Sequence, residues 1–515
     1  MTSPLQSALA DASVEADNLV AVVAQQATTI EDRSIASYAR DTVLQNNIDS
    51  LAAQIGNLAM NVDQNKLDAD VQFTQLSTAI SALAARVVKL ETPPVVVVPP
   101  PVPPTTPTGF LNLKSKSKLV APAPPLSVGA TVKQADTGAT IRRLANGLID
   151  YSRFTRVSPD GKYVFVMGEN STSMRIVNIS DGTDAFIYDN IGEYHEPRWD
   201  YTEVAASKTF YYVRGMTFNK MTLGVGTQVI RDFTADFPGG SEIINDVEGD
   251  SSHDSRYWCW MVRKITQTGK YPIQNIFTYD KQTNTILGRW AASDLVKGSD
   301  TPAGYITWPN MVEIAPDGSK AIVHWDRAYT GNNGNLAGTH QDGPHAYPLN
   351  LAITGNVKIG VAATHSGWAQ HTDGRWMFVH QNSRNDYIEA SDLVNGWKAD
   401  GTGVIRLLYA GEDTDWSCGF HFSKLYNKKG WVLVSTYSDL NKDWMDDQLF
   451  FLPLEANGTP LRICDTLNLY PGDTAYRNEA SASCSFDGNG IYWTSNGLGL
   501  HARSVYEVRL PNNWG

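Results

Sequence analysis

The ten histidines are the residues of this sequence whose chemistry is most open to a functional interpretation. All ten follow residue 194, and six lie between His340 and His421. Imidazole can bind a metal, transfer a proton or form hydrogen bonds. No pair has the tight H-x-H or H-E-x-x-H spacing of metal-binding motifs. We expect most of them to form structural hydrogen bonds, with a ligand site and then a metal or catalytic site as the alternatives. The candidates for a ligand site are His340, His345, His365, His371 and His421.

The tryptophans offer a second kind of binding group. All fourteen follow residue 198, and most lie in apolar runs where a large side chain would fill the core. Those near predicted loops, beside Asp and Asn, could stack against sugar rings: Trp308, Trp368, Trp397, Trp416 and Trp444.

One segment, "DLNKDWMDDQ", has the oxygen-ligand spacing of a calcium loop. Asp439, Asn441 and Asp443 stand at the first three ligand positions of an EF-hand, but Trp444 replaces its glycine and Phe450 its bidentate glutamate. We therefore predict a solvated loop and no cofactor, with structural Ca²⁺ as the alternative.

A repeated pattern explains how these side chains would be positioned. The clearest unit, "FTRVSPDGKYVFVMGENSTSMRIVNISDG" at 154–182, indicates a strand, a turn, two further strands and a second turn. Similar units begin at six further residues: His195, Val247, Asn310, Ser366, Gly419 and Ser481. Each unit is an antiparallel meander with two apolar faces, and radial stacking of seven such units buries both faces. We predict an all-β domain at 138–515, a seven-bladed β-propeller.

The S-P-D-G-K-Y-V segment resembles the repeats of TolB-like and WD40-like propellers, which supports the fold and says little about function. The last unit ends at "VYEVRL" without a fourth strand. The segment "GATIRRLAN", 138–146, is predicted to fill that edge and close the ring. Propeller lyases that cleave acidic sugars hold a metal with His and Gln near the channel, and Gln370–His371 resembles such a pair.

The segment "IGEYHEPRWDY" places four polar groups at the entry to one inner strand. Glu193, His195, Glu196 and Arg198 are expected to form a buried ion-pair cluster between blades. A polar site at the mouth of the channel is the alternative.

The first 92 residues have a different character. Apolar residues step by three and four along two runs, which predicts a coiled-coil stalk at 44–92 after a helical attachment segment at 1–43. The runs are Leu44, Ile48, Leu51, Ile55, Leu58, Val62, and then Phe73, Leu76, Ile80, Leu83, Val87, Leu90. A proline-rich linker at 93–109, with eight prolines in residues 93–107, and a lead-in segment at 110–137 follow.

The composition limits the classes of binding partner that we expect. The net charge of −12 argues against nucleic acid and anionic membranes. We expect no signal peptide, because the first residues lack a basic and an apolar region, and no membrane span, because no run of 18 apolar residues occurs. The four scattered cysteines are expected in the core, although one disulfide remains open.

The whole plan, a helical stalk, a proline-rich linker and a β head, resembles bacteriophage fibres. This resemblance implies a virion-surface homotrimer, with a dimer as the alternative. Its N-terminus would be anchored on the virion and its head would bind a host polysaccharide or receptor. A polysaccharide lyase with a His-rich site and a purely structural propeller are the alternatives, and we favour binding over catalysis.

Overall fold

A computed structural model describes residues 126–511 apart from short internal ranges, which are 135–136, 150, 152, 169–171, 266–271, 299–303, 308, 326–335, 362–364, 383–386, 399–400, 411–417, 439–444 and 470–477. The predicted attachment segment, coiled coil and proline-rich linker lie outside the described residues. So do Trp308, Trp416, Trp444 and the three predicted calcium ligands, Asp439, Asn441 and Asp443. Within the described part, no helix is long and apolar enough to cross a membrane.

The described strands form seven antiparallel sheets, which we number 1 to 7. Sheet 1 contains β3 (Tyr163–Met167), β4 (Met174–Asn178) and β5 (Asp184–Tyr188). Sheet 2 contains β6 (Arg198–Trp199), β7 (Thr209–Arg214), β8 (Thr217–Thr222) and β9 (Gly226–Asp232). Sheet 3 contains β10 (Glu242–Ile244), β11 (Tyr257–Arg263), β12 (Ile273–Asp280) and β13 (Thr285–Ala291). Sheets 4 and 5 contain β14 (Pro309–Ile314), β15 (Lys320–Trp325), β16 (Pro344–Pro348) and β17 (Val357–Lys358); and β18 (Ser366–Gln370), β19 (Trp376–Asn382), β20 (Tyr387–Asp392) and β21 (Val404–Tyr409).

Sheet 6 contains β22 (Cys418–Ser423), β23 (Trp431–Ser438), β24 (Gln448–Pro453) and β25 (Leu461–Asp465). Sheet 7 contains β1 (Thr131–Lys133), β2 (Thr140–Asn146), β28 (Ser504–Arg509), β27 (Gly490–Ser495) and β26 (Ser483–Cys484). Two short 3₁₀ helices, η2 (Glu193–His195) and η3 (Ala292–Asp294), lie between strands.

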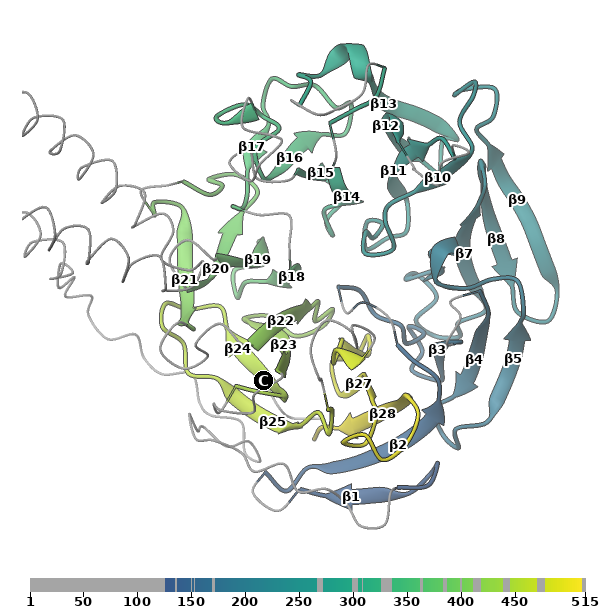
Figure 1. The fold of residues 1–515 in the computed structure, drawn as a ribbon, viewed down its shortest axis with the longest axis vertical. Coiled ribbons are helices and arrows are strands. Elements are labelled where there is room, and N and C mark those ends of the chain that lie inside the picture. The colour runs from purple at the N-terminus through teal and green to yellow at the C-terminus, as the bar shows by residue number, and fades with distance from the viewer. Residues whose placement is uncertain are drawn as a thin grey trace, which may run out of the picture. The chain divides into compact units, whose positions relative to one another are not determined.

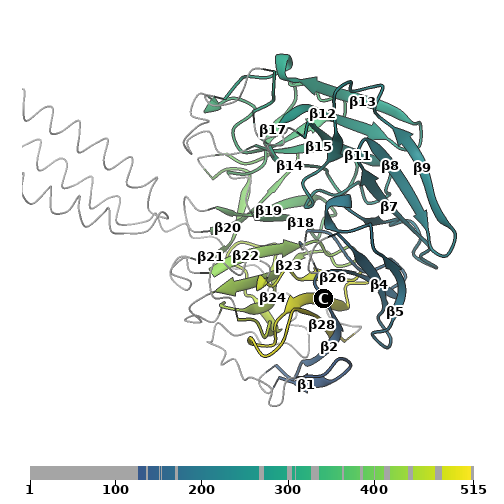
Figure 2. The same cartoon turned by 45° about the vertical axis from the view of Figure 1, so that its right-hand side comes forward.

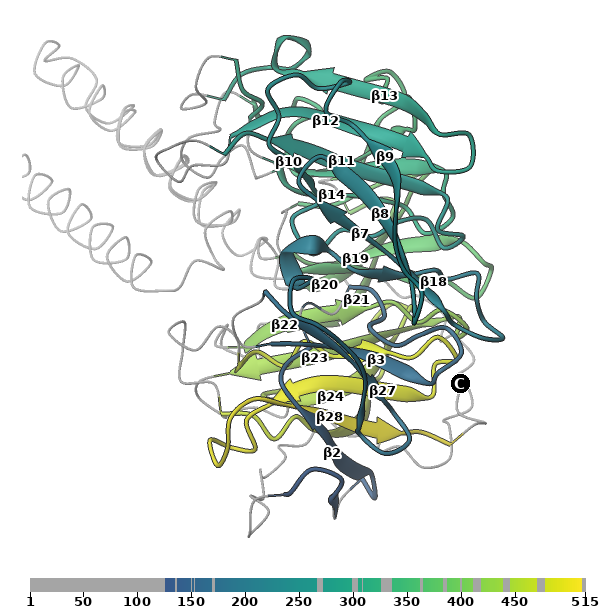
Figure 3. The ribbon, with the colours of Figure 1, turned by 90° about the vertical axis from the view of Figure 1, so that its right-hand side faces the viewer.

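The sheets are the blades of a seven-bladed β-propeller, which confirms the predicted fold of the head. Figure 1 shows them in chain order around a common centre. In sheets 2 and 3 the last strands, β9 and β13, lie on the outside of the ring, as Figure 2 also shows. Figure 3 shows β11, β12 and β13 as neighbours in one sheet. The repeat units predicted at Asn310, Ser366 and Gly419 begin within one residue of β14, β18 and β22.

The ring is closed by strands from opposite ends of the head. β2 pairs antiparallel with β28, from Ile141 opposite Val508 to Asn146 opposite Ser504. This confirms the predicted role of residues 138–146. β1 adds a fifth strand outside β2, which the sequence did not indicate. Closure matters because an open propeller would expose one apolar face at each end.

The Asp-Gly turns have a shared local cause. In the turn before β3, the Ser158 hydroxyl donates to Asp160 Oδ1 at 2.7 Å and accepts from the backbone N–H of Tyr163 at 2.9 Å. Gly161 has a φ of 72°, a left-handed conformation that glycine adopts without a Cβ clash. A Ser–Asp pair recurs at Ser252 and Ser485, so the pattern read in the sequence is a hydrogen-bonded turn.

The core is divided between the blades. The buried apolar residues of the described part form seven clusters, and each joins two neighbouring sheets. Stacked aromatic residues fill several of them, for example Phe165 and Trp199, whose ring centroids lie 4.3 Å apart between sheets 1 and 2. All four cysteines are free and buried, which agrees with their predicted place in the core.

Ring closure can be tested at Ile141, which is 1% exposed in the cluster between sheets 6 and 7. We expect Ile141→Ala to lower the free energy of unfolding by about 2–5 kcal/mol. Urea unfolding of the full chain followed by tryptophan fluorescence measures this, because every tryptophan lies in the head. Thr140→Ala, at an exposed position of the same strand, is the matched control. Equal urea midpoints for the two variants would show that the packing of Ile141 at the ring closure does not contribute to stability.

Candidate functional site

Charged side chains from distant blades meet at the centre of the ring. The Lys424 ammonium, just after β22 in sheet 6, lies 2.8 Å from Asp250 Oδ2 in sheet 3. Arg153, which precedes sheet 1, forms an ion pair with Glu313 of β14 in sheet 4. Sheets 1 and 4, like sheets 3 and 6, are not neighbours, so these contacts cross the axis of the propeller. Polar groups therefore meet at the centre of the ring, which we call the channel, and this region is the natural candidate site.

The first central group is the Arg198 cluster, which we define as Arg198, Asp250, Lys424, Tyr201 and Tyr426. All five side chains are buried. The Asp250 carboxylate lies 3.7 Å from the Arg198 guanidinium and accepts a hydrogen bond from the Tyr201 hydroxyl at 3.1 Å. Lys424 Nζ lies 4.7 Å from the centroid of the Tyr426 ring. Two cations thus enclose one carboxylate, an arrangement that stabilises the buried charge.

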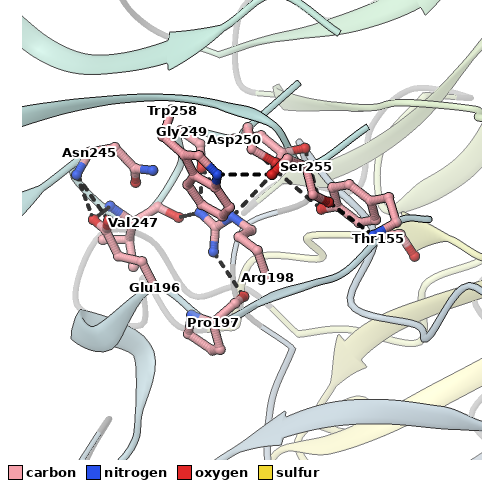
Figure 4. A network of polar contacts seen from close by, with 12 residues as sticks. Thr155, Glu196, Pro197, Arg198, Asn245, Val247, Gly249, Asp250, Ser255 and Trp258 are labelled. Carbon is pink, nitrogen blue, oxygen red and sulfur yellow. Dashed lines mark hydrogen bonds and ion pairs between the residues drawn. The ribbon is translucent and has the colours of Figure 1, made fainter. Parts of the chain in front are cut away.

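The Arg198 guanidinium is fixed from several sides, as Figure 4 shows. It donates to the backbone oxygens of Pro197, Val247 and Gly249, and its carbon lies 3.4 Å from the centroid of the Phe154 ring. These contacts hold the side chain in one orientation. The Arg198 side chain therefore links sheet 2 to the segment between β10 and β11 of sheet 3.

Glu196 is the second buried charge of the "IGEYHEPRWDY" segment. Its carboxylate accepts hydrogen bonds from the backbone N–H groups of Asn245 and Val247 at 2.8 and 2.9 Å (Figure 4). Burial raises its pKa to about 7, although Arg198 and the backbone N–H donors oppose that rise. Glu193 is also buried, on η2. The predicted buried ion-pair cluster is found only in part: Arg198 pairs with Asp250, and Glu196 accepts backbone hydrogen bonds. His195 is half-buried, and its Nδ1 accepts a hydrogen bond from the Gly192 N–H at 3.2 Å.

The Arg153–Glu313 pair is completed by His324 of β15, whose Nε2 lies 2.8 Å from Glu313 Oε1. Burial would raise the pKa of Glu313, but Arg153 and the hydrogen-bonded His324 outweigh it and lower that pKa to about 2. Burial lowers the pKa of His324 to about 4. The carboxylate is thus ionised and the imidazole neutral at pH 7.

The most accessible polar group is the His421 cluster, which we define as His421, Glu479, His365, Tyr437 and Tyr151. His421 Nε2 lies 2.9 Å from Glu479 Oε2, and both side chains are buried. The His365 ring stacks on His421 with centroids 4.8 Å apart, and the Tyr437 ring lies 5.2 Å from His421. Tyr151 approaches His421 edge-on at 6.2 Å. His365, Tyr437 and Tyr151 are only half-buried, so they are the members of the cluster that a ligand can reach.

Two titratable groups, His365 in the cluster and Glu248 beside it, determine the chemistry that this region can offer. Burial and the neighbouring His421 lower the pKa of His365 to about 3, so this imidazole is neutral at pH 7. Burial raises the pKa of the half-buried Glu248 to about 7, against the opposing charges of Arg153 and His421. The region can therefore offer a neutral imidazole, phenol hydroxyls and a carboxyl group that changes charge near neutral pH. Such groups can bind a hydroxyl-rich ligand or move a proton.

The structure brings together two of the five candidate histidines, His365 and His421. His345 is 4% exposed and its Nδ1 lies 3.0 Å from the backbone oxygen of Gly343. His340 packs against Tyr347, and His371 lies in the turn after β18, 3.1 Å from Asp373. These three residues make local contacts away from the His421 cluster.

The described tryptophans do not form a binding platform at the channel. Trp368 is 1% exposed and packs between sheets 4 and 5, so its ring has no face open to a ligand. Trp397 is half-buried and donates from Nε1 to Glu389 Oε2 at 3.0 Å. The apolar run around Trp368 is an inner strand, and the sequence did not distinguish that strand from a loop edge.

No local sequence pattern pointed to four residues of the central groups: Glu248, Glu479, Tyr437 and Arg153. Their importance comes from meeting across the axis. Across the ranges that the structure describes, no three His, Cys, Asp or Glu side chains lie close enough together to hold a metal ion.

Comparisons with known proteins add little to this geometry. No family model matches the chain, and no curated protein matches it. Among solved structures, an oligogalacturonate lyase from Vibrio parahaemolyticus is similar at 12% identity with a TM-score of 0.47, covering 75% of this chain and 97% of that chain. Hydrazine synthase from Kuenenia stuttgartiensis is similar at 14% identity with a TM-score of 0.38, covering 71% and 98%. A chain of the mitotic checkpoint complex is similar at 9% identity with a TM-score of 0.37, covering 82% and 97%. These likenesses carry no argument about function.

The buried Arg153–Glu313 pair yields a stability prediction. We expect Glu313→Gln to lower the free energy of unfolding by about 3–5 kcal/mol, because it leaves the Arg153 charge buried without its carboxylate. The double variant Arg153→Met/Glu313→Gln should lose clearly less than the sum of the losses in Arg153→Met and Glu313→Gln. Urea unfolding of all four proteins measures this coupling. Additive losses would show that the pair is not coupled.

The raised pKa of Glu248 yields a pH prediction. The unfolded carboxyl titrates near its ordinary value of 4.5 and the folded one near 7, so the folded state keeps its proton longer. This group's contribution to stability is present below about pH 4.5 and is lost as the pH rises to 7, by on the order of 1–3 kcal/mol. Glu248→Gln should remove that part of the slope in urea unfolding between pH 5 and 8. Glu455→Gln, in the turn after β24, is the control and should keep the wild-type slope.

Proposed function

We propose that this chain is the receptor-binding protein of a virion fibre and that its propeller binds a host-surface polysaccharide through the His421 cluster. The observation that carries the proposal is the convergence of His365, Tyr437 and Tyr151, all half-buried, above the buried His421–Glu479 pair.

Sugars present hydroxyl groups at their edges and C–H groups on their faces. The Tyr437 and Tyr151 hydroxyls can donate and accept, and a neutral His365 offers one donor and one acceptor. The tyrosine and histidine rings, 5.2 to 6.2 Å apart by centroid, offer apolar faces beside those polar atoms. Because the supporting pair below is buried and hydrogen-bonded, the binding groups are held in place before a ligand arrives.

The predicted N-terminal segments give the site its proposed context. A coiled coil at 44–92 would join three chains, with two as the alternative, and the linker at 93–109 would separate the heads from the stalk. Three heads on one fibre gain avidity from effective concentration, so a weak site per head suffices for attachment. The segment at 1–43 would anchor the fibre on the virion.

A second function, cleavage of a polysaccharide, is favoured by one observation. Burial raises the pKa of the Glu248 carboxyl to about 7, although the charges of Arg153 and His421 oppose that rise. A general acid or base works best with a pKa near the working pH. In this alternative Glu248 exchanges a proton with the sugar while the cluster binds it.

A polysaccharide array tests the binding proposal. The purified full chain is applied to bacterial capsular polysaccharides and lipopolysaccharides, and binding and release of reducing or unsaturated sugar ends are recorded together. We expect binding to at least one polysaccharide that falls about five- to thirtyfold in Tyr437→Ala and His365→Ala, since each removes a contact worth about 1–2 kcal/mol. His371→Ala, which alters a histidine in a distant turn, is the control and should bind like wild type.

The same array separates the alternatives. Release of sugar ends that disappears in Glu248→Gln would replace the binding function with the enzyme. Binding that survives both cluster variants would place recognition outside the channel and contradict the proposed site. An array with neither binding nor release would contradict both functions.

A further inference from the structure

A cavity of about 480 Å³ lies between sheet 1 and the closing sheet, outside the channel. It is lined by the turn before β3, the end of β4 and the neighbouring strands β2 and β28. Its volume falls within the range of roughly 300–1,000 Å³ that small-ligand sites occupy. The cavity exists because the chain closes its ring here, where the first and last strands of the head pair.

The charge of this cavity differs from that of the chain. Three of its lining residues are cations, Arg142, Lys162 and Arg509, and one is an anion, Glu507. The chain as a whole carries 54 acidic and 42 basic residues. A local excess of cations in an acidic protein favours an anionic ligand, because the remaining surface repels one.

The Arg142 side chain is fixed in one orientation by its neighbours. Its Nε lies 2.8 Å from Glu507 Oε1, Nη1 donates to the Ser180 oxygen at 3.1 Å, and Nη2 donates to the Ile179 oxygen. A guanidinium has five N–H donors, so three fixed contacts leave two for a ligand while the plane stays in place. An anion bound here would not have to order the side chain first.

The other two cations lie at the open rim. The Arg509 side chain is 47% exposed, and its Nε is 4.0 Å from Glu507 Oε2. It forms no hydrogen bond with another residue in the part of the chain that the structure describes. The Lys162 side chain is 61% exposed and lies 3.3 Å from Asp160, so Arg509 is the more available cation.

We propose that this cavity binds an anionic sugar unit, with its carboxylate on Arg142 and Arg509. Arginine suits a carboxylate because its parallel N–H groups can bond both oxygens. The hydroxyls are expected on Glu507 and on Asn178, which also lines the cavity. Asn178 Nδ2 donates one N–H to Thr183 Oγ1 at 3.1 Å, which leaves its second N–H and its amide oxygen for the sugar. This site is separate from the channel and does not rest on the proposed function.

The test uses the full chain and three probes: sodium glucuronate, methyl glucoside and inorganic phosphate. Binding of each is titrated by ligand-observed NMR for wild type, Arg509→Gln, Arg375→Gln and the channel variant Tyr437→Ala. Arg375 is the control matched in exposure, because its side chain is 48% exposed, and it lies just before β19 and does not line the cavity. We expect glucuronate to bind wild type and Arg375→Gln equally and Arg509→Gln about tenfold more weakly, with methyl glucoside much weaker than glucuronate throughout.

Each other result overturns the proposal. Phosphate that binds as tightly as glucuronate, with the same loss in Arg509→Gln, would make the cavity a general anion site and not a sugar site. Equal glucuronate binding by wild type and Arg509→Gln would place the ligand elsewhere. A loss in Tyr437→Ala without a loss in Arg509→Gln would place it in the channel. Absence of glucuronate binding to wild type would remove the site.

Discussion

Every blade of this propeller has two apolar faces, and each face can be buried only by the next blade. The seven apolar clusters of the described part satisfy this requirement one interface at a time, and the seventh depends on β2 pairing with β28. The fold is therefore cooperative around a ring, since no blade has a complete core of its own. The polar side chains that meet at the axis come from inner strands, such as Glu313 of β14, and from segments beside them, such as Asp250 and Lys424.

The chemistry of the axis follows from the burial of these polar side chains. Charged groups that cannot reach bulk water must pair with each other, and pairs such as Lys424–Asp250 and Arg153–Glu313 do so between blades on opposite sides. These contacts make the centre rigid. The half-buried His365, Tyr437 and Glu248 are the exception, because they keep part of their surface accessible while their neighbours fix them. A binding site built in this way keeps its shape, and its properties depend on burial as much as on residue type.

The sequence was sufficient for the architecture of the head and insufficient for its site. The Ser–Asp–Gly turns and the repeated meander predicted seven blades, and the missing last strand predicted closure by residues 138–146. Those signals are local or periodic. The meeting of His421 with Glu479, 58 residues later, depends on how β22 and the segment before β26 come together at the axis, and no single unit encodes this. Trp368 shows the same limit, because a buried inner-strand tryptophan and a rim tryptophan have similar neighbours in sequence. The coiled coil, the trimer and the calcium loop stay predictions, since they fall outside the described residues.

The most direct test of the account is hydrogen–deuterium exchange of the full chain with and without a polysaccharide that it binds. Ligand in the channel should slow exchange in the segments that carry Glu248, His365, His421 and Glu479, and leave the outer strands β9 and β13 unchanged. Protection confined to outer strands or to the blade tips, with the four channel segments unchanged, would contradict recognition at the axis.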